Sequence, residues 1–252
     1  MLQNQIILIT GASSGIGAAC AQAFAQAGAK LILVARRQER LQQLADQLAL
    51  QSEIHLISLD VCDRTAVESA IANLPVAWSA IDVLINNAGL SRGLDKLHQG
   101  SYQDWEEMID TNIKGLLYLT RSIVPGMINR GRGHVVNLGS TAGHQTYPGG
   151  NVYCATKAAV RVISEGLKQD LLGTPVRVSS VDPGLVETEF SQVRFRGDTE
   201  RAQKVYQGLT PLTPADVADV VLFCVTRPPH VNISEVLLMP TDQAGSMLFN
   251  RQ

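Results

Sequence analysis

The stretch IILITGASSGIGAACAQAFAQ, residues 6 to 26, joins a strand, a glycine-rich turn and a helix in one unit. Ile6–Thr10 is a continuous apolar run, which is typical of a parallel strand covered by helices on both faces. Ile16–Gln26 is rich in alanine and has the composition of a helix. Thr10–Gly17 connects the two, so its glycines stand where the chain leaves a strand and begins a helix.

The turn TGASSGIG is suited to holding a phosphate group. Backbone N–H groups at a helix N-terminus attract anions, and glycine lets the backbone approach a pyrophosphate closely. The spacing is G-x-x-x-G-x-G rather than G-x-G-x-x-G, and a glycine-rich turn alone is often only a turn. Its position directly after an apolar strand favours a dinucleotide site. We predict that this site includes Gly11, Ser13, Ser14, Gly15, Ile16 and Gly17.

The alternation of short β-branched runs and helical stretches continues along the chain and predicts an α/β fold. Strands are predicted over Ile6–Thr10, Lys30–Ala35, Glu53–Ser58, Val83–Asn86, His134–Leu138, Val176–Val181 and Glu235–Met239. Helices are predicted over Ile16–Gln26, Gln38–Leu48, Arg64–Asn73, Tyr102–Asn129, Val152–Leu172 and Pro214–Thr226. We expect a Rossmann-like, doubly wound parallel sheet of about seven strands with helices on both faces, forming a single dinucleotide-binding and catalytic domain over residues 1–252. The long aperiodic stretch 184–211 indicates a substrate loop or lid.

Composition excludes several classes of function. Lys and Arg number 21 against 23 Asp and Glu, so the formal net charge of −2 gives no overall field that favours nucleic acid or an anionic membrane. The four cysteines are scattered without C-x-x-C spacing and the first residues carry no targeting signal, so we expect a cytoplasmic protein with reduced thiols. The five histidines lack metal-ligand spacing, and we expect no metal site.

The end of the second strand, LVARR, indicates which dinucleotide binds. Sites selective for NAD place an acid there, and an acid repels a 2′-phosphate. Ala35 occupies that position and is followed by Arg36 and Arg37, whose planar guanidinium groups suit a phosphate. The alternative is a solvated basic start of the next helix, although positive charge there opposes the helix dipole. We therefore predict NADP as the cofactor, with the hydroxyl of Ser13 or Ser14 near the same phosphate.

The ends of the third and fourth strands supply further candidates. After the third strand come Asp60 and Val61, where the carboxylate either accepts from the adenine amino group or serves as a cap or turn residue, with neither interpretation favoured. The fourth strand ends in the small and amide residues NNAG. We expect Asn86 to tie neighbouring strands together. Cofactor contact is expected from Asn87, Ala88 and Gly89.

Ser140, Tyr153 and Lys157 form the most specific pattern in the chain. Tyr153 and Lys157 are four residues apart, so on a helix they share one face. A tyrosine alone titrates too high to be an efficient base at neutral pH, and a nearby ammonium stabilises the phenolate and lowers its pKa. Ser140 follows the fifth strand and can hydrogen-bond a substrate oxygen. A Y-x-x-x-K pair is common by chance, but its combination with the glycine-rich turn and NNAG is not.

These motifs, in this order, resemble the short-chain dehydrogenase/reductase family, and the resemblance extends from Ile6 to about Met239. It is carried by Thr10–Gly17, Asn86–Gly89, Asn112, Ser140, Tyr153, Lys157 and Pro183-Gly184. It implies that Tyr153 is the general acid/base, that Lys157 holds the nicotinamide ribose, and that Ser140 orients the substrate. It also implies that Asn112 supports a water that leads protons to Lys157. The implied contacts with the nicotinamide and a nearby phosphate are Pro183, Gly184, Val186 and Thr188.

A narrower resemblance, to bacterial NADP-dependent 3-hydroxy acid dehydrogenases, is carried by WEEMIDTNIK (105–114), GSTAG (139–143), VRFRGD (193–198) and PHVNI (229–233). It implies a small 3-hydroxy acid or its carbonyl form as substrate, such as serine, allo-threonine, 3-hydroxyisobutyrate or malonic semialdehyde. A carboxylate entering a partly desolvated pocket needs a cation, and Arg194 and Arg196 are the candidates, unless they are simply solvated. The sequence departs from the group at 91–94 and at His144, which we expect to line the substrate pocket.

Two other functions compete with an NADP-dependent dehydrogenase of small 3-hydroxy acids. One is a broad carbonyl or 3-oxoacyl-thioester reductase on the same scaffold, and the other is a cofactor-sensing regulator without chemistry. A regulator would be expected to have lost Tyr153 or Lys157, and both are present. The partners expected are a small-molecule substrate and further copies of the chain, with no nucleic acid and no membrane. Apolar residues on several faces of 102–129 and 152–172, like the resemblance, imply a homodimer or homotetramer.

Overall fold

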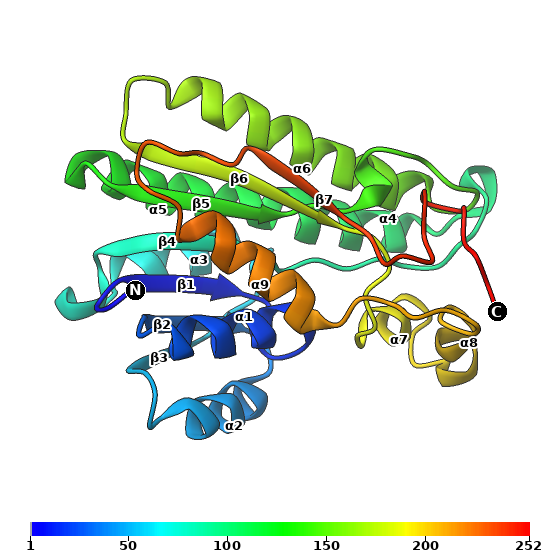
Figure 1. Cartoon of the computed structure of the whole chain (residues 1–252), viewed down its shortest axis with the longest axis horizontal. Coiled ribbons are helices and arrows are strands. Elements are labelled where there is room, and N and C mark those ends of the chain that lie inside the picture. The colour runs from blue at the N-terminus through cyan, green and yellow to red at the C-terminus, as the bar shows by residue number, and fades with distance from the viewer. Residues whose placement is uncertain (1) are drawn as a thin grey trace.

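The computed structural model describes residues 2–252 and is built around one seven-stranded parallel sheet (Figure 1). The strands stand in the order β3-β2-β1-β4-β5-β6-β7, and every neighbouring pair is parallel. Their bounds are β1 Ile6–Thr10, β2 Lys30–Ala35, β3 Ile54–Ser58, β4 Ile81–Asn86, β5 Gly133–Leu138, β6 Val176–Pro183 and β7 Glu235–Leu238. The predicted doubly wound α/β fold is confirmed.

Helices cover both faces of the sheet, as the continuous apolar strands require (Figure 1). On one face lie α1 (Gly15–Gln26), α2 (Gln38–Leu48) and α9 (Pro214–Val225). On the other lie α3 (Arg64–Ala72), α5 (Leu116–Arg130) and α6 (Asn151–Asp170), with α4 (Tyr102–Ile109) against α6. The strand β1 shows the principle, because Ile7 and Ile9 enter one core and Ile6 and Leu8 enter the other.

The carboxyl ends of β1 and β4 form the switch point of the sheet. The chain winds outward from β1 to β3 on one side and then from β4 to β7 on the other, which leaves a crevice between the first turn of each half. The hydroxyl of Thr10 joins the halves, since it accepts hydrogen bonds from the N–H groups of Asn87 and Ala88. Asn86 ties β4 to β5 through Asn137, at 2.9 Å. Asn86 therefore joins two neighbouring strands, as we expected from the sequence.

The predicted helix over 102–129 is interrupted by a π-helical turn, Asp110–Gly115, which joins α4 to α5 without a break in the chain direction. The sequence analysis merged α4 and α5 into one helix because a single inserted residue leaves the helical composition unchanged. Two short helices, α7 (Phe190–Arg194) and α8 (Thr199–Lys204), lie within the predicted loop 184–211, beyond the carboxyl end of the sheet (Figure 1). Over residues 2–252, no helix is both long and apolar enough to cross a membrane.

Candidate active site

A cleft of about 610 Å³ opens at the carboxyl ends of the strands, between the two halves of the sheet and beneath α7. It is where the switch-point rule places a ligand. Of the residues predicted from the sequence, those lining it are Gly11, Ser13, Ser14, Gly15, Ile16, Arg36, Arg37, Asp60, Val61, Asn87, Ala88, Gly89, Ser140, Tyr153, Lys157, Pro183, Gly184, Val186, Thr188 and Arg194. Four others do not line it, namely Gly17, Asn112, His144 and Arg196.

The glycine-rich turn leaves the start of α1 available to an anion. Ser14 occupies the N-cap position, yet its side chain makes no capping hydrogen bond to the helix. Gly11 has a φ of 64°, and a Cβ at Gly17 would lie 2.4 Å from the Gly11 carbonyl oxygen. Gly17 therefore serves the close packing of the turn rather than direct contact with the cleft. These features fit a pyrophosphate group at the N-terminus of α1.

Arg37 is held at the mouth of the cleft by a set of oxygen atoms. Its guanidinium donates to the hydroxyl of Ser13 at 3.0 Å and to that of Ser14 at 2.7 Å. It also pairs with the carboxylate of Glu189 at 3.0 Å, and Arg40 pairs with the same carboxylate at 2.5 Å. The two hydroxyls and the Arg37 guanidinium converge just after β2 and form a donor set that fits a phosphate ester, with Arg40 outside the cleft.

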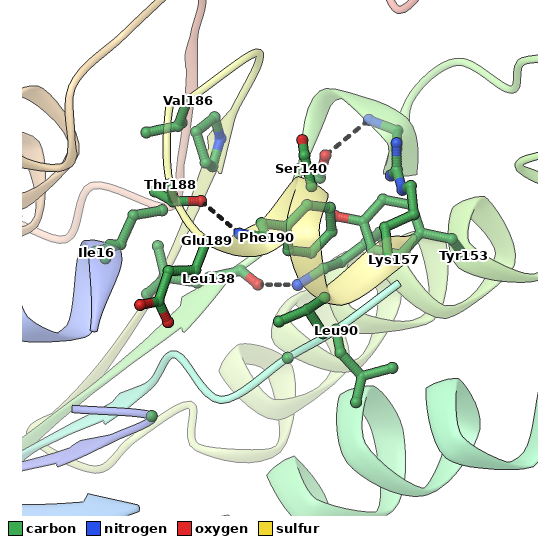
Figure 2. A pocket seen from close by; sticks show the side chains of 18 of the residues that line it. Ile16, Leu90, Leu138, Ser140, Tyr153, Lys157, Val186, Thr188, Glu189 and Phe190 are labelled. Carbon is green, nitrogen blue, oxygen red and sulfur yellow. Dashed lines mark hydrogen bonds between the residues drawn. The ribbon is translucent and has the colours of Figure 1, made fainter. Parts of the chain in front are cut away.

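Glu189 is a member of this cluster that the sequence analysis missed. It stands directly before α7, and its side chain faces the cleft in Figure 2. Burial raises its pKa, but the hydrogen bonds from Arg40 and Arg37 outweigh that effect, so that the net pKa is lowered. The carboxylate therefore stays charged near neutral pH and forms ion pairs with Arg37 and Arg40. Since Glu189 is more than 140 residues from Arg40 in sequence, no local pattern could have linked them.

For Asp60 the sequence left two roles open, a contact with adenine and a cap or turn role, and the structure shows the turn contact. Its Oδ1 accepts a hydrogen bond from the N–H of Cys62 at 3.0 Å, as in an Asx turn. Its Oδ2 lies 3.7 Å from Arg36. Because Asp60 and Val61 also line the cleft, the turn role does not remove them from reach of an adenine ring.

The three residues of the catalytic pattern all line the cleft and lie in the same part of it (Figure 2). Tyr153 and Lys157 lie on α6, both 7% exposed, and Lys157 donates to the Leu138 carbonyl at 2.7 Å. Burial lowers the pKa of Lys157 to about 8, and the charge of Asp182 opposes that effect. The side chain thus remains largely an ammonium at neutral pH, one helical turn from the phenol.

The pKa of Tyr153 is raised by burial, because the phenolate would lose its hydration. A hydrogen bond with Ser140 and the positive charge of Arg194 act in the opposite direction. The sequence pattern predicted a net lowering by Lys157, and in the protein alone burial outweighs the favourable groups. A phenol in this setting is protonated at rest and needs a ligand-dependent change to act as a base.

Asn112 lies behind the cleft rather than on its wall. The π-helical turn directs its amide to Leu90, where Oδ1 accepts from the backbone N–H and Nδ2 donates to the carbonyl, each at 2.8 Å. A Cβ at Gly89 would lie 3.2 Å from the Asn112 oxygen and 3.5 Å from the Lys157 nitrogen. The amide and the ammonium therefore converge beside Gly89, as required if Asn112 is to act through Lys157.

The part of the cleft nearest Tyr153 contains a cation. The guanidinium carbon of Arg194 lies 5.5 Å from the ring centre of Tyr153 and 5.1 Å from that of Phe190. Its Nη2 donates to the hydroxyl of Tyr147 at 3.1 Å. Among residues 2–252, its Nε is one of only three buried side-chain nitrogen or oxygen atoms without a hydrogen-bond partner. A buried donor without a partner, next to the phenol, fits an anionic group of a substrate.

The structure corrects the expectation for two predicted substrate residues. Arg196 has a left-handed φ of 51° at the end of α7, and its guanidinium turns away to pair with Asp104 and Glu107. His144 bonds to the buried carboxylate of Asp182 at 2.6 Å, on the side of its loop away from the cleft. Neither side chain lines the cleft.

Several cleft residues carry no sequence signal that we used. Tyr147 and Phe190 form an aromatic wall around Arg194, and only their proximity to Tyr153 or to the VRFRGD segment hinted at a role. The segment after β7 also reaches the cleft and is held to the loop after Ser140 by the hydroxyl of Ser246, which donates to the Gln145 carbonyl at 2.9 Å. From this segment Ser246, Met247, Phe249 and Arg251 line the cleft.

Comparison with known proteins agrees with this geometry. The family model for short chain dehydrogenase matches residues 5–198. An NADP-dependent 3-hydroxy acid dehydrogenase of Escherichia coli is 51% identical over 240 residues, which cover 95% of this chain and 96% of that protein. A sulfoacetaldehyde reductase of Chromohalobacter salexigens is 46% identical over 244 residues, covering 96% and 97%. The solved closed form of a serine dehydrogenase complexed with NADP+ matches with a TM-score of 0.93 at 50% identity, covering 98% of this chain and 100% of that one.

Proposed function

The chain belongs to the short-chain dehydrogenase family, and on that basis we propose that it is an NADP-dependent oxidoreductase of small 3-hydroxy acids and their carbonyl forms. The observation that carries the substrate class is Arg194, a cation with a buried unpaired nitrogen beside the phenol of Tyr153. The decisive experiment is a substrate panel with NADP+ that compares L-serine and 3-hydroxyisobutyrate with neutral alcohols. Turnover of an acetoacetyl thioester in a parallel assay with NADPH, with no turnover of the acids, would instead support the broader reductase.

NADP(H), when bound, supplies the hydride acceptor or donor. The glycine-rich turn would hold its pyrophosphate, and Arg37 with Ser13 and Ser14 would hold the 2′-phosphate. Lys157 and the loop before Val186 would position the nicotinamide end. All of these side chains face one cleft, so one extended ligand can reach them together.

Tyr153 would exchange a proton with the substrate oxygen, while Ser140 donates a hydrogen bond to that same oxygen. In the oxidation direction the phenol must first lose its proton, although burial raises its pKa. The guanidinium of Arg194 and the hydrogen bond with Ser140 both favour the phenolate. Asn112, fixed at Leu90, would support a water through which protons reach Lys157.

Arg194→Ala should raise the KM for 3-hydroxy acids much more than the KM for neutral alcohols. A hydrogen bond to a charged group contributes about 1.5–3 kcal/mol, which corresponds to a rise of about 10-fold to 150-fold. The matched control is Arg196→Ala, which removes the same charge two residues away but outside the cleft, and it should leave both values nearly unchanged. An equal rise for acids and neutral alcohols would remove Arg194 from carboxylate recognition.

Glu189→Gln should tighten the binding of NADPH and leave the binding of NADH unchanged. The carboxylate competes with the 2′-phosphate for Arg37, and its removal also releases Arg40. Because the side chains are partly exposed, we expect a gain of about 0.2–1 kcal/mol, or about 1.5-fold to 5-fold in Kd. Fluorescence titration with both cofactors measures this, and the same shift for NADH and NADPH would show that Glu189 does not oppose the phosphate.

We propose further that the protein works in the cytoplasm as a homodimer or homotetramer. In support, Leu117 on α5 and Val162 on α6 are exposed apolar side chains, 41% and 56%, on the two longest helices of residues 2–252. Leu116 and Leu119, also on α5, are buried in the monomer core and are not available for this contact. Sedimentation of the purified protein tests the oligomeric state.

A further inference from the structure

Three titratable side chains meet behind the loop that carries Ser140, outside the cleft. Asp182 near the end of β6 is 1% exposed, and His144 ends the short helical turn Thr141–Gly143. The Nε2 atom of His144 lies 2.6 Å from Oδ2 of Asp182 and 3.4 Å from Oε1 of Glu235 on β7. These contacts join two strands to the loop 139–144.

Asp182 supports this loop at both of its ends. Its Oδ1 accepts a hydrogen bond from Ser180 at 2.5 Å, and a Cβ at Gly139 would lie only 2.0 Å from the same oxygen. The carboxylate therefore packs directly on the backbone of Gly139, whose N–H donates to the Val181 carbonyl at 2.9 Å. At the other end of the loop the carboxylate meets His144. Any side chain at Gly139 would push the carboxylate out of this place.

Ser140 lies between these two fixed points. Its hydroxyl accepts a hydrogen bond from the N–H of Ala142 at 3.1 Å, so its orientation follows the backbone of the same loop. We propose that His144 and Asp182 form a positioning pair, which clamps the loop 139–144 so that the hydroxyl of Ser140 meets both the phenol of Tyr153 and the substrate oxygen. This inference rests on the proposed function, because it gives Ser140 the role of orienting the substrate.

The charges that face the pair come from two elements. Glu235 lies on β7, while Lys157 and Arg161 lie on α6. Asp182 raises the pKa of Lys157, and together with burial it raises the pKa of Glu235. Asp182 thus acts on two of the three residues of the catalytic pattern. It reaches Ser140 through the backbone of Gly139, and it affects the pKa of Lys157 through its charge. His144 is connected to Ser140 only through the loop 139–144.

The central test compares His144→Leu with His144→Gln. The leucine variant cannot donate to Asp182, and kcat should fall about 10-fold to 100-fold, since a displacement of about 1 Å at a reacting group can cost about 100-fold. The glutamine variant keeps a donor and should recover most of this loss. The Kd for NADPH should stay at the wild-type value in both variants, whereas the Tm should fall in His144→Leu, because Asp182 loses a buried hydrogen bond, and should recover in His144→Gln. The control is His98→Leu, an exposed histidine outside the cleft, which should retain full kcat.

A second variant, Asp182→Asn, separates the effect of Asp182 on the loop of Ser140 from its effect on the charge of Lys157. It removes the charge near Lys157 and should lower the pKa of that ammonium, so the alkaline decline of kcat should move to lower pH. His144→Leu keeps the carboxylate charge and should lower kcat without that displacement. Unchanged kcat in His144→Leu, or a fall in kcat accompanied by equal loss of NADPH binding, would overturn the proposal.

The three ligand atoms lie within 4.8 Å of one another, so a divalent cation is the competing occupant of this cluster. Dialysis of the wild-type protein against EDTA should leave kcat unchanged. Loss of activity that returns with added Zn²⁺ would replace the hydrogen-bonded pair by a metal site. Failure of the proposed function itself is recognised separately, because the wild-type protein would then turn over none of the acids whatever occupies position 144.

Discussion

Tyr153→Phe should abolish turnover of every substrate while leaving NADPH binding nearly intact. In the proposed function the phenol exchanges a proton with the substrate oxygen, and a positioned acid/base contributes about 100-fold to 10,000-fold to the rate. The phenylalanine ring keeps the contacts with Phe190 and the guanidinium of Arg194, so the wall of the cleft stays in place. Steady-state kcat and a fluorescence titration with NADPH measure the two effects.

The matched control for this substitution is Tyr102→Phe. Tyr102 is 77% exposed at the start of α4 and lines no part of the cleft, so loss of its hydroxyl should leave kcat unchanged. A Tyr153→Phe protein that kept more than about one-tenth of the wild-type rate would refute the acid/base role, since even the lower end of the expected contribution is about 100-fold.

Arg37→Ala should weaken NADPH binding by about 10-fold to 150-fold and leave NADH binding almost unaffected. The expected loss corresponds to about 1.5–3 kcal/mol for hydrogen bonds to a charged group, in this case the 2′-phosphate that only NADP(H) carries. Arg37 is better placed than Arg36, because Ser13 and Ser14 fix its guanidinium in the cleft. Arg36 is 67% exposed and lies 3.7 Å from Asp60, so its removal should have a smaller effect.

Arg40→Ala tests whether Arg37 acts as a specific ligand or only as a positive charge. Arg40 shares the carboxylate of Glu189 with Arg37 but does not line the cleft. Its loss should change NADPH affinity by much less than the loss of Arg37. Equal losses for the two variants would mean that the region attracts the phosphate by its overall charge alone.

The fold could be predicted from the sequence because its signals are local. Each strand buried on both faces is a continuous apolar run, and the glycines of the first turn identify the β1–α1 junction without reference to any other element. The Tyr153–Lys157 pair was equally accessible, since four residues on a helix fix a shared face. These features depend on neighbours in sequence, which a single chain displays directly.

The errors concern contacts between distant segments. Arg194 and Arg196 are two residues apart and chemically identical, and only the left-handed backbone at Arg196 and its acidic partners on α4 decide which one faces the cleft. His144 adjoins the site in sequence, yet its partner Asp182 lies 38 residues away. The net direction of the Tyr153 pKa shift also depended on burial by several elements. Such outcomes are set by tertiary packing, which residue type and spacing do not encode.

The π-helical turn between α4 and α5 sets how the side chains of one helix are rotated relative to those of the other. Each residue of a regular helix rotates the side-chain direction by about 100°. One extra residue in this turn therefore rotates the side chains of α4 by about that angle relative to those of α5. Met108 before the turn and Leu119 after it are both buried, and Asn112 within it points at Leu90. Deleting a single residue here would restore a regular helix but would misalign one face or the other, so the irregular turn lets Met108 and Leu119 stay buried while Asn112 reaches Leu90.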